Sequence, residues 1–172
     1  MENFLWALAY VWPAYVTNAT PVVAVKILKR RHPIDMHATF IDGRRLLGDG
    51  KTIEGFVSGL AFGTLIGLAM MLLIPGLFRW PLEILLITLG AMMGDIAGTF
   101  IKRRLGIPHG GPAPILDQLG FLAGSLALIA ATIGLPKWLD MVTIAQLAVF
   151  TLIMHIATNV FAYLLKIKDR WW

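Results

Sequence analysis

Two aspartates stand out because their surroundings are apolar. Asp95 lies within an apolar run, seven residues before the basic cluster Lys102-Arg103-Arg104. A carboxylate at membrane depth costs on the order of 2.5–3.5 kcal/mol, so it needs a partner or a function. Asp117 begins the next apolar run, after a proline-rich loop that can return it toward the depth of Asp95. Two converging carboxylates form an oxygen-rich site suited to Mg²⁺. An ion pair with a basic residue or a proton-relay role are the alternatives for Asp95.

A glycine-rich segment before the second apolar run is the third polar feature. Its Gly50-Lys51-Thr52 step is like the end of a P-loop, but Arg45 stands where that motif needs a glycine. A glycine-rich turn, a lysine and a hydroxyl at a helix N-terminus still favour phosphate oxygens. The alternative is that Thr52 or Asp49 is a simple N-cap. Together the three features indicate a metal-bound polyanion, for which a nucleoside triphosphate is the natural candidate.

The amino-acid composition indicates that these polar groups lie in a protein embedded in a lipid bilayer. Of the 172 residues, 58% are hydrophobic and 15% charged, and the mean hydropathy is +0.74, too apolar for a soluble domain. Runs of about 20 apolar residues can cross a hydrocarbon core roughly 30 Å thick. We therefore expect an all-α integral membrane protein, a bundle of about five transmembrane helices forming a single membrane domain over residues 1–172. The expected spans are 4–25, 56–77, 82–101, 116–135 and 142–167.

The basic residues indicate the orientation of the bundle. Thirteen of the 15 Lys and Arg fall in the connections 26–55 and 102–115 or in the C-terminal tail, and two, Arg79 and Lys137, fall in the opposite connections. This asymmetry predicts two long cytoplasmic loops, an N-terminus outside and a C-terminus in the cytoplasm. We expect a multi-pass protein of the cell membrane with its site facing the cytoplasm, and no nucleic-acid partner.

Small and polar residues within the spans predict some of the packing. Three glycines recur at every fourth position in each of the second and third spans, and such faces let helix backbones approach closely. We expect the two spans to pack on each other through Gly59, Gly63 and Gly67 and through Gly90, Gly94 and Gly98. Asn18 in the first span is expected to satisfy backbone groups freed by Pro21.

At these residues the chain resembles the cytidylyltransferases that make CDP-lipids, and above all the archaeal CDP-archaeol synthases. The motifs that carry the resemblance are Asp42-Gly43-Arg44-Arg45 through Gly48-Asp49-Gly50-Lys51-Thr52, Gly94-Asp95, Thr99-Phe100-Ile101-Lys102-Arg103, His109-Gly110-Gly111 and Asp117-Gln118. Gly120 stands where relatives often have a further acidic residue, which leaves a second metal short of a ligand.

The resemblance implies a reaction and roles for these residues. It implies that a cytidylyl group passes from CTP to 2,3-bis-O-geranylgeranylglycerol 1-phosphate, an unsaturated archaeal ether-lipid phosphate, giving CDP-archaeol and pyrophosphate with Mg²⁺. Asp95 and Asp117 would bind the metal, and Lys102 would act with them at the reacting phosphates. The other candidates would contact nucleotide or lipid phosphates or order the loop: Lys51, Thr52, Arg103, and more weakly Asp42, Arg44, Asp49 and Glu54.

The main alternative function is a small transporter or channel that uses Asp95 as an ion site. The absence of an internal sequence repeat and the gathering of polar residues at one face count against it. The oligomeric state is left open.

Overall fold

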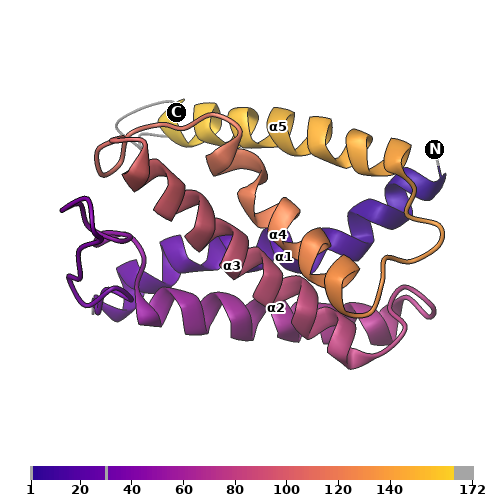
Figure 1. The fold of residues 1–172 in the computed structure, drawn as a ribbon. Coiled ribbons are helices and arrows are strands. Elements are labelled where there is room, and N and C mark those ends of the chain that lie inside the picture. Colours follow the sequence, from indigo (N-terminus) through magenta and orange to yellow (C-terminus); the bar gives the residue numbers. More distant parts are fainter. Residues whose placement is uncertain (1, 30, 165–172) are drawn as a thin grey trace.

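Five helices, joined by two long and two short connections, make up the chain (Figure 1). The structure is a computed structural model and describes residues 2–29 and 31–164. The helices are α1 (Glu2–Leu28), α2 (Ile53–Leu73), α3 (Pro81–Arg104), α4 (Leu116–Thr132) and α5 (Met141–Leu164). Within the described ranges the only β pairing consists of two isolated bridges, Pro33 with Thr52 and Thr39 with Arg45. The predicted all-helical class is confirmed.

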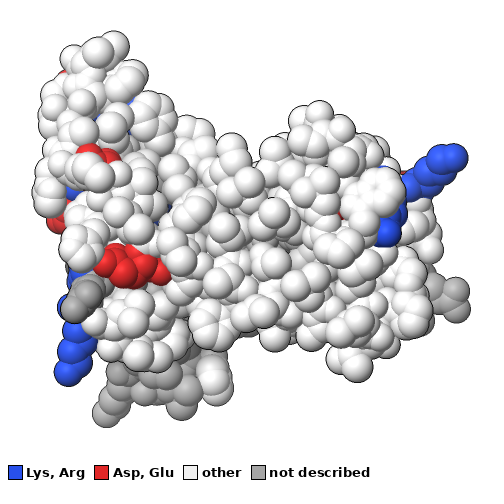
Figure 2. All heavy atoms as spheres, turned by 90° about the horizontal axis from the view of Figure 1, so that it is seen from below, with Lys and Arg blue, Asp and Glu red and all other residues white. Residues whose placement is uncertain are grey.

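The connections divide the bundle into two different ends (Figure 1). The long connections, 29–52 and 105–115, lie together at the loop end, toward which α5 also runs. The short connections, 74–80 and 133–140, lie at the opposite hairpin end, where α1 begins. On the face seen in Figure 2, charged side chains gather at these two ends and an uncharged surface lies between them.

Three described segments are long and apolar enough to cross a membrane: Ile53–Leu73, Pro81–Arg104 and Met141–Phe161. Helix α4 is apolar but shorter, with 17 residues, and α1 contains both Pro13 and Pro21. All five helices overlap the five apolar runs of the sequence. The three C-terminal basic residues Lys166, Lys168 and Arg170 lie outside the described residues.

Local signals explain where the site-bearing helices begin and end. Thr52 is the N-cap of α2, and its Oγ1 accepts a hydrogen bond of 3.1 Å from the Gly55 N–H. Helix α3 begins with Pro81, whose missing N–H costs nothing in the first turn. It ends in Lys102, Arg103 and Arg104, which face the negative end of the helix dipole.

The glycines of α2 pack mainly on α1 and meet the α1 backbone at Gly59 and Gly63. A Cβ added to Gly59 would lie 2.7 Å from the Thr17 carbonyl oxygen, and one added to Gly63 would lie 3.0 Å from that of Pro13. The rings of Pro13 and Pro21 fill the space beside this glycine face. Pro21 has no N–H to donate to the Thr17 carbonyl, and Gly59 gives that carbonyl room.

The glycines of α3 pack on α4. A Cβ on Gly90 would lie 2.6 Å from the Gly124 carbonyl oxygen, and one on Gly94 would collide with that of Gly120. The prediction that α2 and α3 meet through their glycine faces is therefore wrong, although Met92 and Ile84 of α3 do reach glycines of α2. A glycine face presents the same flat surface to any helix, so its spacing does not specify the partner.

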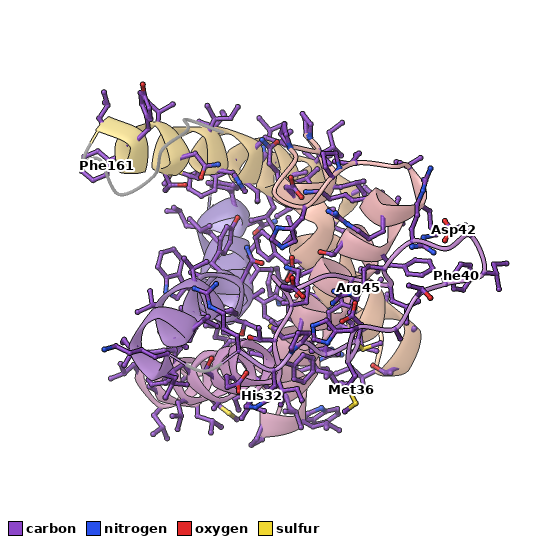
Figure 3. All side chains as sticks on the ribbon, turned by 90° about the vertical axis from the view of Figure 1, so that its left-hand side faces the viewer. His32, Met36, Phe40, Asp42, Arg45 and Phe161 are labelled. Atoms are coloured by element: carbon purple, nitrogen blue, oxygen red, sulfur yellow. The ribbon has the colours of Figure 1, made fainter. Side chains whose placement is uncertain are left out.

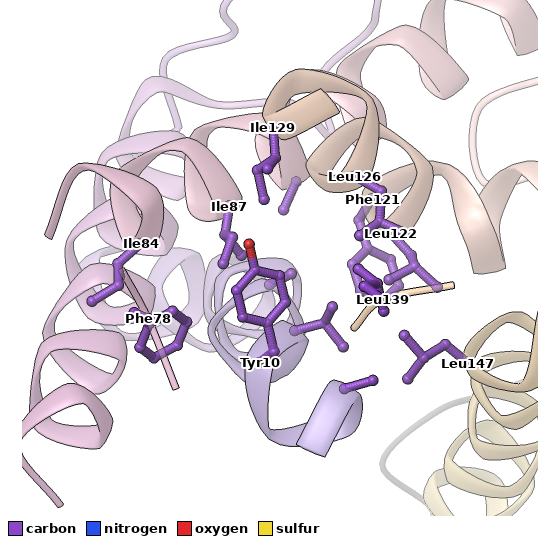
Figure 4. Packing of buried hydrophobic residues seen from close by; sticks show 14 of the residues in the cluster. Tyr10, Phe78, Ile84, Ile87, Phe121, Leu122, Leu126, Ile129, Leu139 and Leu147 are labelled. Atoms are coloured by element: carbon purple, nitrogen blue, oxygen red, sulfur yellow. The ribbon is translucent and has the colours of Figure 1, made fainter. Parts of the chain in front are cut away.

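The hydrophobic core fills the hairpin half of the bundle around Tyr10 (Figure 4). Within this core Glu83 of α3 is fully buried. It accepts hydrogen bonds of 2.5 Å from the Tyr10 hydroxyl and 2.7 Å from Nη2 of Arg79. Arg79 also donates to the Gly134 carbonyl after α4. This network joins α1, α3 and the end of α4 at the hairpin end, whereas the cavity lies in the loop half of the bundle. No sequence motif predicted the network.

Gly90→Ala should destabilise the bundle, because its methyl group would force α3 and α4 apart at a cost of about 1–3 kcal/mol. The measurement is thermal unfolding in detergent, followed by tryptophan fluorescence. Gly98→Ala on the same helix is the matched control, since its Cβ would meet only the Leu116 carbonyl oxygen at an ordinary 3.4 Å. Equal transitions for the two variants would contradict the close contact.

Candidate active site

A cavity of about 470 Å³ lies at the loop end between α1, α2, α3 and the two long loops. Its volume falls in the range of small-molecule sites. Four basic and three acidic side chains contribute to its lining, together with several hydroxyl, amide and imidazole groups. The polar lining residues are Asn18, Arg31, Asp49, Lys51, Thr52, Asp95, Thr99, Lys102, Arg103, His109 and Asp117. The two candidate metal ligands and most of the predicted phosphate ligands thus come together in one cavity.

Asp95 forms an ion pair with Lys51, which reaches it from the loop before α2. An ion pair was one of the alternatives for Asp95, and the structure contains it. The pair is not sealed in the core, because the side chains of Lys51 and Asp95 are 25% and 27% exposed. Both line the cavity, so a ligand there can compete for either charge.

Asp117 forms the second ion pair of the cavity, with Lys102. The Lys102 Nζ lies 2.7 and 2.9 Å from the two carboxylate oxygens, and the Ala113 N–H donates to one of them at 2.9 Å. Lys102 is buried, whereas Asp117 is 37% exposed. Positions 95 and 102 are about two turns apart on α3 and share a face, so both ion pairs meet the cavity from the same side of that helix.

The backbone just before Asp117 is strained. Ile115, the N-cap residue of α4, has φ 74°, a conformation that a β-branched residue adopts rarely. Such strain costs on the order of 1–3 kcal/mol and clusters at functional sites. Here it lies between the proline-rich loop and the carboxylate of Asp117.

The remaining phosphate candidates in the cavity have distinct surroundings. Thr52 is the helix N-cap, as the simpler alternative held, and it also lines the cavity. Asp49 accepts a hydrogen bond of 3.1 Å from Arg45. The buried Nε of Arg103 has no hydrogen-bond partner among the described residues, while its Nη2 donates to the Pro108 carbonyl at 3.2 Å.

Three weaker candidates lie outside this lining. Glu54 accepts hydrogen bonds from the backbone and ring of His32. Asp42 pairs with Nη1 of Arg104 at 2.8 Å, and Arg44 donates to the Arg104 carbonyl at 2.8 Å. In the described structure these three side chains order the loop, which was the second of the two roles expected of them.

Arg104 clamps the first loop onto the end of α3. Its guanidinium carbon lies 4.9 Å from the ring centres of both Phe40 and Phe100, a cation–π arrangement. Nη2 donates to the Arg45 carbonyl at 2.6 Å. Figure 3 looks onto the loop end, with Phe40 and Asp42 at the edge of the view and Arg45 nearer its centre.

Asp35 is a second anchor of the same loop. Burial by itself raises the pKa of this carboxyl. Hydrogen bonds from Arg45 and from the N–H groups of Gly48, Leu47 and His37 outweigh burial and hold the pKa well below its usual range. Because the pKa of Asp35 is lower in the folded loop than in the unfolded chain, the ionised carboxylate stabilises the folded loop. This stabilisation is complete above the unfolded-state pKa of about 4 and weakens as the pH falls below it.

Sequence reasoning gave two cavity residues, Arg31 and Asn18, other roles, and quoted a third, His109, as part of a motif in the second loop. Arg31 was counted only as a basic residue that sets topology, and Asn18 was expected to serve the backbone of α1. His109 lies against the glycine turn, since a Cβ on Gly50 would be 3.1 Å from its Nε2. The one sequence signal for Asn18 was its polarity within an apolar span. Arg31 had no separate signal among its basic neighbours.

An apolar helical bundle with a basic, carboxylate-containing cavity at one end defines a membrane-embedded enzyme for phosphorylated substrates. A family model described as CarS-like, CDP-archaeol synthase, matches residues 1–172. The chain belongs to the CDP-archaeol synthase family and is a CTP-dependent cytidylyltransferase. The resemblance drawn from the sequence motifs is confirmed.

Individual relatives match over nearly the whole chain. A CDP-archaeol synthase of Aeropyrum pernix is 45% identical over 172 residues, which are 100% of this chain and 94% of the relative. One of Pyrobaculum islandicum is 44% identical and covers 99% of both. A solved structure described as "Structural insight into an intramembrane enzyme for archaeal membrane lipids biosynthesis" superposes with a TM-score of 0.79 at 44% identity. The match covers 90% of this chain and 92% of that one. A transporter or channel is not favoured by these findings.

Arg104→Lys should loosen the first loop, because lysine cannot keep the planar stack and the forked hydrogen bonds together. Hydrogen bonds to charged groups are worth about 1.5–3 kcal/mol, so we expect chymotrypsin to cleave after Phe40 about tenfold faster. Limited proteolysis in detergent measures the rate. Arg103→Lys is the control, and equal rates for the wild type and Arg104→Lys would rule out the clamp.

Proposed function

We propose that this chain transfers the cytidylyl group of CTP to 2,3-bis-O-geranylgeranylglycerol 1-phosphate, giving CDP-archaeol and pyrophosphate. The observation that carries the proposal is the single cavity lined by Asp95, Asp117, Lys51 and Lys102. The family to which the chain belongs supports the choice of both substrates.

The lining of the cavity suits a substrate that is anionic at one end and apolar at the other. Val22 and Val25 of α1 line the same space as Lys51 and Lys102, and Val22 is 61% exposed on the outer surface of the bundle. An ether lipid can therefore keep its chains against α1 while its phosphate reaches the lysines.

The donor set fits Mg²⁺. Magnesium is usually bound through one or two carboxylates, with substrate phosphates and water completing its shell. Asp95 and Asp117 are two carboxylates that face one cavity. No group of three or more His, Cys, Asp or Glu that could hold a metal ion occurs among the described residues, so a cation bound by Asp95 and Asp117 would take its other ligands from phosphates and water. When bound there, Mg²⁺ would neutralise the CTP phosphates and the departing pyrophosphate.

The chemistry asks mainly for positioning and charge. A phosphate oxygen of the lipid forms the new bond to the α-phosphorus of CTP, in line with the bond to the β-phosphate that breaks. The electron pair of the broken bond leaves with pyrophosphate. The attacking phosphate is already an anion, so no side chain has to remove a proton. Lys51, Lys102 and Arg103 would hold the phosphates, with Arg103 offering a forked donor.

Each of the two candidate metal ligands forms an ion pair with a lysine of the cavity. Lys51 neutralises Asp95 and Lys102 neutralises Asp117. The pairing matters because an unpaired carboxylate in a low-dielectric space is costly. Nucleotide phosphates would offer the lysine ammonium groups new partners, and Asp95 and Asp117 would then be available to hold a cation. The same four side chains can therefore pair with one another or bind a cation and phosphates.

Asp95→Asn and Asp117→Asn should each abolish detectable turnover. Losing a ligand that stabilises transferred charge by several kcal/mol lowers the rate by at least about 100-fold. The assay is pyrophosphate release by purified protein in detergent with CTP, Mg²⁺ and the ether-lipid phosphate, and chelation with EDTA should also stop it. Asp140→Asn at the hairpin end is the charge-matched control, and each variant must keep the wild-type unfolding temperature. Near-normal turnover in either aspartate variant would refute the metal role of that residue.

We further propose that the loop end faces the cytoplasm, with five spans in one membrane domain. The charge asymmetry of the connections supports this orientation. The chain has no cysteine, so single cysteines can report it. Met141→Cys, at a position 77% exposed, should react with a membrane-impermeant maleimide in intact spheroplasts. Ile41→Cys, at a position 94% exposed, should react only after permeabilisation. The reverse pattern would invert the proposed topology.

A further inference from the structure

Asp35 is a buried carboxylate in the first long loop. Its side chain is 0% exposed. It accepts hydrogen bonds of 3.1 Å from Nε and 2.7 Å from Nη2 of Arg45, and of 3.0, 2.9 and 3.2 Å from the N–H groups of Leu47, Gly48 and His37. A carboxylate has about four lone-pair positions, so this acceptor is saturated. It has no capacity left for a substrate, and it is not among the residues that line the cavity.

Two residues that donate to Asp35, Leu47 and Gly48, lie next to the part of the loop that lines the cavity. Leu47 and Gly48 lead into the turn of residues 48–52, and Gly48 has φ +100°, a conformation open to glycine. The Lys51 N–H donates to the Gly48 carbonyl at 3.2 Å, and the Ile34 N–H donates to the Lys51 carbonyl at 2.9 Å. The backbone of Lys51 is therefore tied on one side to a residue that binds Asp35 and on the other to the neighbour of Asp35.

Arg45 extends the anchor to the same turn. Its Nη2, which donates to Asp35, also lies 3.1 Å from the Asp49 carboxylate. The second loop closes the turn from the other side, because the His109 ring lies against Gly48 and Gly50. The Lys51 side chain then leaves the turn to pair with Asp95 on α3.

We propose that Asp35 is a positioning residue that shapes the 48–52 turn and thereby places Lys51 and the backbone N–H groups of the turn for the nucleotide phosphates. This inference rests on the proposed function of the cavity. Asp35 acts through the turn and touches no substrate. Its loss leaves two buried N–H groups without an acceptor and a guanidinium with only Asp49, so the turn no longer holds one conformation.

Asp35→Asn in the full chain tests the inference. Asparagine has nearly the same shape, but its amide nitrogen places a donor where the N–H groups or the guanidinium now donate. We expect the Kd for CTP with Mg²⁺, measured by calorimetry, to rise about tenfold or more, and the KM for CTP to rise by a similar factor. Effects of this size are typical of residues that orient a ligand-binding group without touching the ligand. At saturating CTP the turn is ordered by its ligand, and kcat should stay within about threefold of the wild type. Amide hydrogen exchange at Leu47 and Gly48 should accelerate, and the bundle should unfold at the wild-type temperature.

Three further variants separate the outcomes. Asp140→Asn makes the same change of charge at the hairpin end and keeps a good N-cap residue for α5, so every readout should stay at the wild-type value. Arg45→Gln removes the guanidinium that donates two hydrogen bonds to Asp35 and leaves the three backbone hydrogen bonds, so its KM should rise less than that of Asp35→Asn. If Asp35→Asn fails to fold, the KM and Kd of Arg45→Gln test the positioning role of Asp35: raised values support it, and wild-type values contradict it. Lys51→Met should weaken CTP binding directly.

A wild-type KM and Kd in Asp35→Asn, with weakened binding in Lys51→Met, overturns the positioning role and leaves the proposed function intact. A lower kcat at unchanged KM overturns it as well. Normal CTP binding in both Asp35→Asn and Lys51→Met would instead refute the assignment of this turn to the nucleotide.

Discussion

The close contact between α3 and α4 is the constraint on which the rest of this structure depends. Gly90 and Gly94 on one helix face Gly120 and Gly124 on the other, and backbone carbonyls occupy the space where side chains would stand. Helices that approach so closely are held in one register by van der Waals contact. That register brings Asp117 at the start of α4 to Lys102 near the end of α3. It also explains Gly120, because an acidic side chain there would begin with a Cβ only 3.2 Å from the Gly94 carbonyl oxygen.

The two halves of the bundle differ in how they accommodate buried charge. The hairpin half is filled by apolar side chains, and its one buried carboxylate, among those described, is fully satisfied by Arg79 and Tyr10. The loop half contains the polar cavity, and two of its carboxylates, Asp95 and Asp117, are each paired with a lysine. A carboxylate satisfied by several fixed donors keeps its position, whereas a carboxylate that faces the cavity and is paired with a lysine is the kind that we propose exchanges this partner for a cation. The same residue type thus has different uses at the two ends, and its surroundings decide which.

Side-chain contacts anchor the first long loop at several points. Arg104 lies between Phe40 and Phe100, and Asp35 is surrounded by donors. These two residues anchor a segment whose described residues form no regular secondary structure beyond two bridges. Arg44 crosses to the second connection, where its guanidinium lies against Gly106. Anchors of this kind keep a glycine-rich turn in a single conformation, which lowers the entropy lost when a ligand binds. The cavity therefore has one wall of rigid helix and one wall of anchored loop.

The sequence by itself determined the membrane class, the positions of five helices, the family, and a set of candidate residues of which most line one cavity. Each of these follows from local information: hydropathy over about 20 residues, the spacing of Asp95 and Lys102 along one helix, and motifs read in order. Only the tertiary structure decided which helices the glycine faces meet, that Lys51 pairs with Asp95 and Lys102 with Asp117, and that Asp35 accepts hydrogen bonds from Leu47 and Gly48. A glycine face fits any partner, and an ion pair across 44 residues depends on how the intervening loop folds. These contacts are set by the packing of the whole bundle, so no short stretch of sequence could specify them.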